Sequence, residues 1–225
     1  MTFEGMRGAG ELTPVRVLVL TASLRSESLN TCLARLAAVT LQANGCDVDF
    51  ASMAEFDAPS YNEYVEASSG FPPGAHEFRR RLELTDAFVI ASPEYNASFP
   101  GVLKNAIDWV SRFRPQPFNE HHCLLMSASP SMSGGNRGLW ALRVPLEHLG
   151  TRVYPDMFSP RTRTYGARSR RTDREPAAPE SLRGEQHGLH GFGRSIEALR
   201  VRQACLDRVS LPESPDPMFD RVQSR

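Results

Sequence analysis

The chain has 225 residues, 40% of them hydrophobic, which is enough for one good core with a further segment of chain beside it. Its 26 basic and 26 acidic residues cancel to a formal net charge of +0, so no overall field favours nucleic acid or an anionic membrane surface. Residues 1–14 lack the apolar core of a signal peptide, and no stretch approaches the roughly 20 apolar residues of a transmembrane helix, so we expect a cytoplasmic protein with small-molecule ligands.

Short apolar runs alternate with amphipathic segments as far as residue 158. Residues 15–20 form a nearly continuous aliphatic run, typical of a strand covered on both faces, and residues 31–43 carry apolar side chains at helical spacing. The pattern recurs, with strands predicted over residues 46–50, 87–91, 123–126 and 151–158 and helices over residues 75–84, 100–112 and 136–149. Because parallel neighbours need crossover connections, this alternation predicts an α/β fold, a doubly wound five-stranded parallel sheet with helices on both faces.

The loops after the first, third and fourth predicted strands are the expected ligand site, because such sheets bind ligands beyond the carboxyl ends of their strands. The first loop offers hydroxyl, amide and guanidinium groups where a helix begins, which suits a phosphate. These groups belong to Ser23, Arg25, Ser28 and Asn30. Ser28 and Asn30 are equally typical of residues that only cap a helix. Neither a GxGxxG nor a P-loop pattern is present.

The other two loops differ in character. The second contains Pro93, Glu94, Tyr95 and Asn96 and is stiffened by two prolines and a glycine, which suits a flat heterocycle that stacks on a ring and bonds along one edge. The third is rich in small residues, which let a ligand approach the backbone closely. A structural turn and a flexible surface loop are the respective alternatives.

Two motifs together resemble the NADPH-dependent FMN reductase family. The first is the spacing of Ser23, Arg25, Ser28 and Asn30. The second is the long and specific segment 92–109, which reads Ser-Pro-Glu-Tyr-Asn-x-Ser-x-Pro-Gly-x-Leu-Lys-Asn-Ala-Ile-Asp-Trp. The resemblance covers residues 15–158, includes a Ser-Gly-Gly-x-Arg segment at 133–137, and implies a flavodoxin-like fold.

The resemblance also implies a cofactor site. In the family the first motif binds the FMN phosphate, which maps onto Ser23, Arg25, Ser28 and Asn30. The isoalloxazine would be lined, largely through backbone groups, by Pro93, Glu94, Tyr95 and Asn96, and its other side would be closed by Ser129, Ser133 and Gly134. One departure is visible, because Ala22 stands where the family commonly has glycine.

The implied reaction is hydride transfer from NADPH or NADH to flavin N5, followed by electron delivery to a flavin, a quinone or a similar small acceptor. The cofactor carries this chemistry, so no side chain is nominated as acid, base or nucleophile. The family further implies a homodimer or a tetramer. The alternatives are an FMN-binding electron carrier and an inactive product of a damaged reductase gene.

Several other residues receive structural interpretations. Cys32, Cys46, Cys123 and Cys205 show neither a CxxC pair nor zinc-site spacing, so we expect buried thiols and no metal site. We expect His121 and His122 to lie in a solvated turn. Asp108 and Trp109 are interpreted as helix and interface residues.

The composition changes beyond residue 158. Residues 159–225 contain 13 Arg and no Lys, with several Pro and Gly, which predicts a poorly ordered segment. Nine interspersed acidic residues and the lack of an aromatic stacking set argue against a nucleic-acid tail. A compensated reading-frame shift is another explanation, because residues 190–200 can be back-translated so that the next frame encodes a plausible part of the family's final helix. We therefore expect an N-terminal extension over 1–14, a flavodoxin-like FMN-binding domain over 15–158, and an atypical segment over 159–225 in which the final helix is missing or altered.

Overall fold

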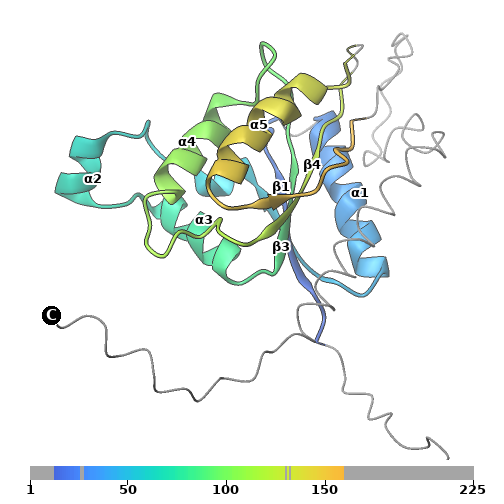
Figure 1. Cartoon of the computed structure of the whole chain (residues 1–225), viewed down its shortest axis with the longest axis horizontal. Helices are drawn as coiled ribbons and strands as arrows, with labels where there is room; N and C mark the ends of the chain where they lie inside the picture. Colours follow the sequence, from blue (N-terminus) through green and yellow to red (C-terminus); the bar gives the residue numbers. More distant parts are fainter. Residues whose placement is uncertain (1–12, 26–27, 130, 132, 160–225) are drawn as a thin grey trace, which may run out of the picture.

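A five-stranded parallel sheet forms the centre of the molecule (Figure 1). The computed structural model describes residues 13–25, 28–129, 131 and 133–159. The strands are β1 (Arg16–Thr21), β2 (Asp47–Ser52), β3 (Ala87–Ala91), β4 (His122–Met126) and β5 (Arg152–Val153). They run in the order β2-β1-β3-β4-β5, and all neighbours are parallel. This is the strand order of a flavodoxin-like doubly wound sheet, so the predicted fold class is confirmed.

Helices cover both faces of the sheet (Figure 1). On one face α1 (Leu29–Ala43) shares a core cluster with Val17 and Val19 of β1. The other face carries α3 (Pro73–Glu83), α4 (Gly101–Val110) and α5 (Asn136–His148), which share a second cluster with Leu18 and Leu20. Alternate residues of β1 thus enter opposite cores, which explains why its sequence is apolar without interruption. Among the helices of the described ranges, none is both long and apolar enough to cross a membrane.

Two short helices and the last strand differ from the prediction. Neither η1 (Met53–Phe56) nor α2 (Glu63–Ser69) was expected from the sequence, and α2 stands away from the sheet with no buried residue (Figure 1). The strand predicted over residues 151–158 is wrong in extent, because β5 is only Arg152–Val153 and pairing resumes at Phe158, which bridges Met126. Pro155 lies in the gap and has no N–H to donate to a ladder. The predicted termini lie outside the described residues, apart from residues 13–14 and 159.

The adjacent histidines are not in a solvated turn. His121 Nε2 lies 3.0 Å from the Leu82 carbonyl oxygen and 2.9 Å from that of Thr85, where α3 ends. His122 is buried in β4, opposite Ala87. The expectation was wrong because the strand begins at His122, and because the end of a helix leaves carbonyls that a ring N–H can satisfy.

The second half of the long motif holds a neighbouring segment in place. Trp109 is fully buried, and its Nε1–H donates to the Pro59 carbonyl at 2.7 Å. Asn105 donates to the same carbonyl at 3.0 Å and accepts from the Tyr61 N–H at 2.8 Å. Asp108 pairs with Lys104 on the outer side of α4. Trp109 is therefore a core residue, and the interface expected there is not supported.

None of the cysteines in the described ranges forms a disulfide. Cys46 and Cys123 are buried as expected, whereas Cys32 is only partly buried. Burial raises the pKa of the Cys123 thiol well above its usual range, because the thiolate would lose its hydration inside the core. Cys205 lies outside the described residues.

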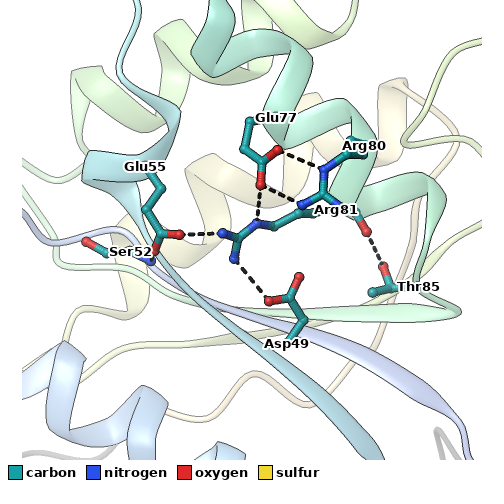
Figure 2. A network of polar contacts seen from close by, with 7 residues as sticks. All are labelled: Asp49, Ser52, Glu55, Glu77, Arg80, Arg81 and Thr85. Atoms are coloured by element: carbon teal, nitrogen blue, oxygen red, sulfur yellow. Dashed lines mark hydrogen bonds and ion pairs between the residues drawn. The ribbon is translucent and has the colours of Figure 1, made fainter.

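An ion-pair network fixes α3 against the edge of the sheet (Figure 2). Arg81 donates to Asp49 of β2 at 3.0 Å and to Glu77 of α3 at 2.8 Å, and it also pairs with Glu55 of η1. Hydrogen bonds from Arg80 and Arg81 lower the pKa of Glu77 to about 2, so this carboxylate stays ionised at neutral pH. One guanidinium thereby joins three elements.

Candidate functional site

The chain between β1 and α1 presents donors at the carboxyl edge of the sheet. Ser28 is the N-cap of α1, where its Oγ accepts from the Asn30 N–H at 3.2 Å, and Ser23 Oγ accepts from the Arg25 N–H at 3.3 Å. Both hydroxyls keep a proton to donate, and the positive end of the α1 dipole lies beside them. Arg25 is exposed and has no ion-pair partner within the described part of the chain. The arrangement suits an anion.

Asn30 joins the first loop to the third. Its Oδ1 accepts from the Ala128 N–H at 2.9 Å, and its Nδ2 donates to the Ala128 carbonyl at 3.1 Å. The residue is buried, so this pairing is shielded from water. Of the two interpretations left open by the sequence, capping describes Ser28, whereas the Asn30 side chain mainly holds two distant segments together.

The second loop closes in a tight turn. Tyr95 N–H donates to the Ser98 carbonyl at 2.8 Å, and Ser98 N–H donates back to the Tyr95 carbonyl at 3.0 Å. Asn96 and Ala97 between them have φ of 52° and 62°, the left-handed geometry of a two-residue hairpin turn. The Tyr95 ring is half exposed beside this turn. The predicted structural turn is present, and it holds a ring at the sheet edge as the ligand interpretation requires.

The third loop carries a line of hydroxyl groups. Ser129 Oγ donates to Ser131 Oγ at 3.0 Å, and Ser131 Oγ lies 3.2 Å from Ser133 Oγ. Gly134 and Gly135 follow with φ of 61° and 94°. A Cβ on Gly134 would lie 2.6 Å from the Ser159 carbonyl oxygen, so this glycine is required by the packing of the chain on itself.

A cavity of about 340 Å³ opens between the three loops. Eight of the eleven predicted cofactor-binding residues line it, namely Ser23, Arg25, Ser28, Asn30, Pro93, Glu94, Tyr95 and Ser129. Leu29 and Ala128 also line it, and the sequence analysis missed both. The only signal for them was their position, next to Ser28 and Ser129 in loops already chosen.

Three predicted residues are not among those that line the cavity: Asn96, Ser133 and Gly134. Asn96 is exposed in the turn. The Ser133 carbonyl accepts from Ser159 Oγ at 3.3 Å, and Gly134 packs on Ser159 as well. These contacts turn the segment toward Ser159.

Ala22 fits its position without strain. It is 1% exposed, belongs to the core, and its N–H donates to the Ala91 carbonyl at 2.9 Å. Its φ is not positive, so the backbone does not need glycine there. Alanine is therefore accommodated at this departure from the family pattern.

The residues at the cavity fit a phosphorylated flavin. The volume lies in the range of about 300–1,000 Å³ that is usual for small-molecule sites. Its lining includes the Ser23 and Ser28 hydroxyls, the start of α1 and the Arg25 guanidinium from the first loop, and Pro93 and Tyr95 from the second. No cluster of three metal-binding side chains occurs among residues 13–159 as far as they are described.

The fold and the cavity at its switch point define a flavodoxin-like flavoprotein. The sequence profile of the NADPH-dependent FMN reductase family matches residues 15–162, and the chain belongs to that family. The expected class of enzyme, a flavin-dependent reductase that uses NAD(P)H, is thereby confirmed at the level of the family.

The sequences of several relatives align with about 60% of the length of this chain. An NAD(P)H-dependent FMN reductase of Pseudomonas aeruginosa is 41% identical over 135 residues, which are 60% of this chain and 71% of that protein. A quinone reductase of Escherichia coli is 36% identical over 143 residues, or 62% of this chain and 73% of that protein. Among solved structures, the flavoenzyme NAD(P)H:acceptor oxidoreductase FerB of Paracoccus denitrificans superposes with a TM-score of 0.62 and 28% identity, covering 82% of this chain and 98% of FerB.

Proposed function

We propose that this chain binds FMN in the cavity between the three loops and uses NAD(P)H to reduce a small acceptor of the quinone or flavin type. The observation that carries the proposal is the cavity itself, whose lining combines the exposed Arg25 guanidinium, two hydroxyls and the start of α1 with Pro93 and the aromatic ring of Tyr95. Similar proteins include an FMN reductase and several quinone reductases, which favours these acceptors.

The proposed residue roles follow the chemistry at each end. Ser23, Ser28 and Arg25 hold the phosphate, and Asn30 keeps the first and third loops at the right separation through Ala128. Pro93, Glu94 and Tyr95 form the wall along the ring, with Asn96 in the turn that shapes it. Ser129 closes the other side, and Ser133 and Gly134 support it from behind.

When bound, FMN supplies the redox chemistry, accepting a hydride from NAD(P)H and passing electrons to the acceptor. The chain supplies position and shielding. The Tyr95 ring, half exposed at the opening, offers a face on which a nicotinamide or a quinone can stack. Arg25 and the α1 dipole balance the phosphate charge, which keeps the cofactor bound between turnovers.

A titration that compares FMN with riboflavin tests the phosphate end. We expect the Arg25→Gln protein to bind FMN about tenfold more weakly than the original protein does, a loss of roughly 1.4 kcal/mol, with riboflavin affinity unchanged. Arg35→Gln is the matched control, because Arg35 is exposed on α1, which follows the loop that holds Arg25, and it does not line the cavity. Equal losses for both flavins would contradict the assignment of Arg25.

Turnover separates the three functions that the sequence left open. Oxidation of NADPH or NADH by the FMN-loaded protein, with a quinone present and oxygen excluded, is the expected result for a reductase. Bound flavin that NAD(P)H does not reduce would identify an electron carrier instead. A folded protein that binds no flavin would identify an inactive relative.

We also propose that residues 15–158 form the FMN-binding domain of a cytoplasmic homodimer or tetramer without nucleic-acid or membrane partners. Exposed apolar side chains favour self-association, since Leu24 and Val102 lie beside the first and second loops and Trp140 and Val144 lie one turn apart on α5. The balanced charge gives nucleic acid no electrostatic attraction. Sedimentation velocity at several protein concentrations tests the assembly, and a monomer at all of them would contradict it.

A further inference from the structure

Glu94 lines the cavity together with Pro93 and Tyr95, and its carboxylate also connects the second loop to α5. Its Oε1 accepts from Arg137 Nε at 2.9 Å and from Arg137 Nη2 at 2.5 Å, and its Oε2 accepts from the Gly138 N–H at 3.1 Å. The Glu94 side chain is only 7% exposed, whereas that of Arg137 is 63% exposed. Both carboxylate oxygens are therefore engaged by the first turn of α5.

The two segments also touch through their backbones. A Cβ on Gly138 would lie 3.0 Å from the Ser98 carbonyl oxygen and 3.2 Å from Glu94 Cβ. The first turn of α5 thus packs against the residue before the Tyr95–Ser98 turn and against the residue that ends it. Because Gly138 has no side chain, the carboxylate of Glu94 can reach the start of the helix.

The turn between these two contacts needs external support. Asn96 and Ala97 both have positive φ, and alanine is a residue that adopts this region only under constraint. Asn96 and Ala97 are exposed, so no core packing holds them. The two backbone hydrogen bonds between Tyr95 and Ser98 close the turn, and its contacts with α5 lie at the two ends, on Glu94 and Ser98.

The charge state of Glu94 is compatible with a permanent contact. Burial on its own raises the pKa of this carboxyl, but hydrogen bonds from Arg137 and Gly138 outweigh burial and hold the pKa below its usual value. The group is therefore ionised at neutral pH. Both of its oxygens accept hydrogen bonds from the start of α5, and an ionised carboxylate has no proton to donate.

We propose that Glu94 is a positioning residue, which with Arg137 and the Gly138 N–H clamps the Tyr95–Ser98 turn onto α5 and so fixes the wall of the flavin cavity. The inference rests on the proposed function, because that wall is assigned to the flavin ring. It assigns Arg137, which does not line the cavity, an indirect part in cofactor binding.

Hydrogen exchange on the full-length protein without flavin tests the clamp itself. We expect the amides of Tyr95 and Ser98 to exchange about tenfold faster in Glu94→Ala and Arg137→Met proteins, while β1 amides keep their protection. We expect the exchange rates in the Glu94→Gln protein to lie between those of the unaltered protein and of Glu94→Ala, because the Gln amide oxygen still accepts from the Gly138 N–H. Asp108→Asn is the matched control, since it breaks an exposed ion pair on α4 away from the cavity. Unchanged exchange at Tyr95 and Ser98 in Glu94→Ala would overturn the inference.

Flavin titrations test the link to the cofactor. We expect Glu94→Ala and Arg137→Met each to weaken FMN and riboflavin binding about tenfold, with the double variant no weaker than the weaker single variant, since both changes break one clamp. Independent, additive losses, or an Arg137→Met protein with unchanged affinity, would overturn the inference. If the unaltered protein binds no FMN, the proposed function fails together with the cofactor link, and the exchange experiment still decides whether Glu94 fixes the turn.

Discussion

Ala97 is the residue at which backbone conformation and residue type conflict most clearly. It shares a two-residue turn with Asn96, and both have positive φ, the geometry for which Asn-Gly is a preferred pair. A Cβ in this region is unfavourable by roughly 1–2 kcal/mol. We expect Ala97→Gly to raise the free energy of unfolding in urea by about 0.5–1 kcal/mol, because relief of strain exceeds the entropy that glycine adds to the unfolded chain.

Ala67 provides the matched control for this substitution. It is exposed in α2, where its backbone is already helical and holds no such strain. Ala67→Gly should lower the free energy of unfolding by up to about 1 kcal/mol. Destabilisation by Ala97→Gly of the same size as that by Ala67→Gly would show that the turn is not strained.

Asn30 contributes more to stability than most polar side chains, because its side chain hydrogen-bonds two buried backbone groups at once. Asn30→Ala leaves the Ala128 N–H and carbonyl without their partners. We expect the free energy of unfolding to fall by about 2 kcal/mol and FMN affinity to fall with it, measured by urea denaturation and flavin titration. Asn44→Ala removes one partly buried hydrogen bond to the Thr40 carbonyl, so we expect it to lower the free energy of unfolding by less than Asn30→Ala does. Equal losses would indicate that the Asn30 pair is not shielded.

At the scale of elements, the Arg81 network makes the attachment of α3 depend on pH. The pKa of Glu77 is about 2 in the folded protein and ordinarily 4.5, so its contribution is complete above about pH 4.5 and is lost as the pH falls through 2. We expect Glu77→Gln to lower the free energy of unfolding by about 1 kcal/mol at neutral pH, a value reduced for solvent screening, and by progressively less toward pH 2. Urea denaturation at several pH values measures this difference.

Glu83→Gln serves as the control for the network. Glu83 pairs with Arg79 one helical turn away, and both side chains are substantially exposed. Such a pair contributes about 0.3–0.5 kcal/mol. A pH-independent loss for Glu77→Gln would mean that its charge is not what holds α3 to β2 and η1.

The elements that the sequence predicted well are those with a strong apolar pattern. β1, β3 and β4 and helices α1, α3, α4 and α5 each show an aliphatic run or an apolar stripe, because each is buried against the sheet. α2 buries no residue, so periodicity gave no signal, although Asn62 as N-cap and Gly70 as a stop were readable. β5 was overestimated because its apolar character continues past Val153, while Pro155 ends the hydrogen-bonded ladder.

The candidate site also has features that the sequence predicts and features that depend on tertiary contacts. The three loops were predictable from strand order alone, because parallel strands bring their carboxyl ends to one edge. The partners of Asn30 and Glu94 were not, since they lie 98 and 43 to 44 positions away and depend on how two loops meet in space. Sequence therefore indicated which residues surround the cavity, and the structure separates those available to a ligand from those that hold the loops.

At the scale of the whole molecule, these cross-loop contacts predict that the cavity forms with the fold. Asn30 joins the first loop to the third, and Glu94 joins the second to α5, so contacts within the chain link all three loops to the fold. We expect FMN to associate in one phase whose rate rises linearly with flavin concentration in stopped-flow fluorescence, because no rearrangement precedes binding. A rate that saturates at high flavin concentration would instead identify a conformational step.

Cofactor binding at such a site also stabilises the whole fold. FMN at a concentration one hundred times its Kd should raise the free energy of unfolding by about 2.7 kcal/mol, because only the folded chain holds the three loops together. At that same FMN concentration the free energy of unfolding of the Arg25→Gln protein should rise by roughly 1.4 kcal/mol less, which equals its expected loss in binding free energy. Agreement between the calorimetric shift and the titrated affinity would show that binding and folding are linked through this one site. A shift larger than the affinity allows would require a second flavin site on the molecule.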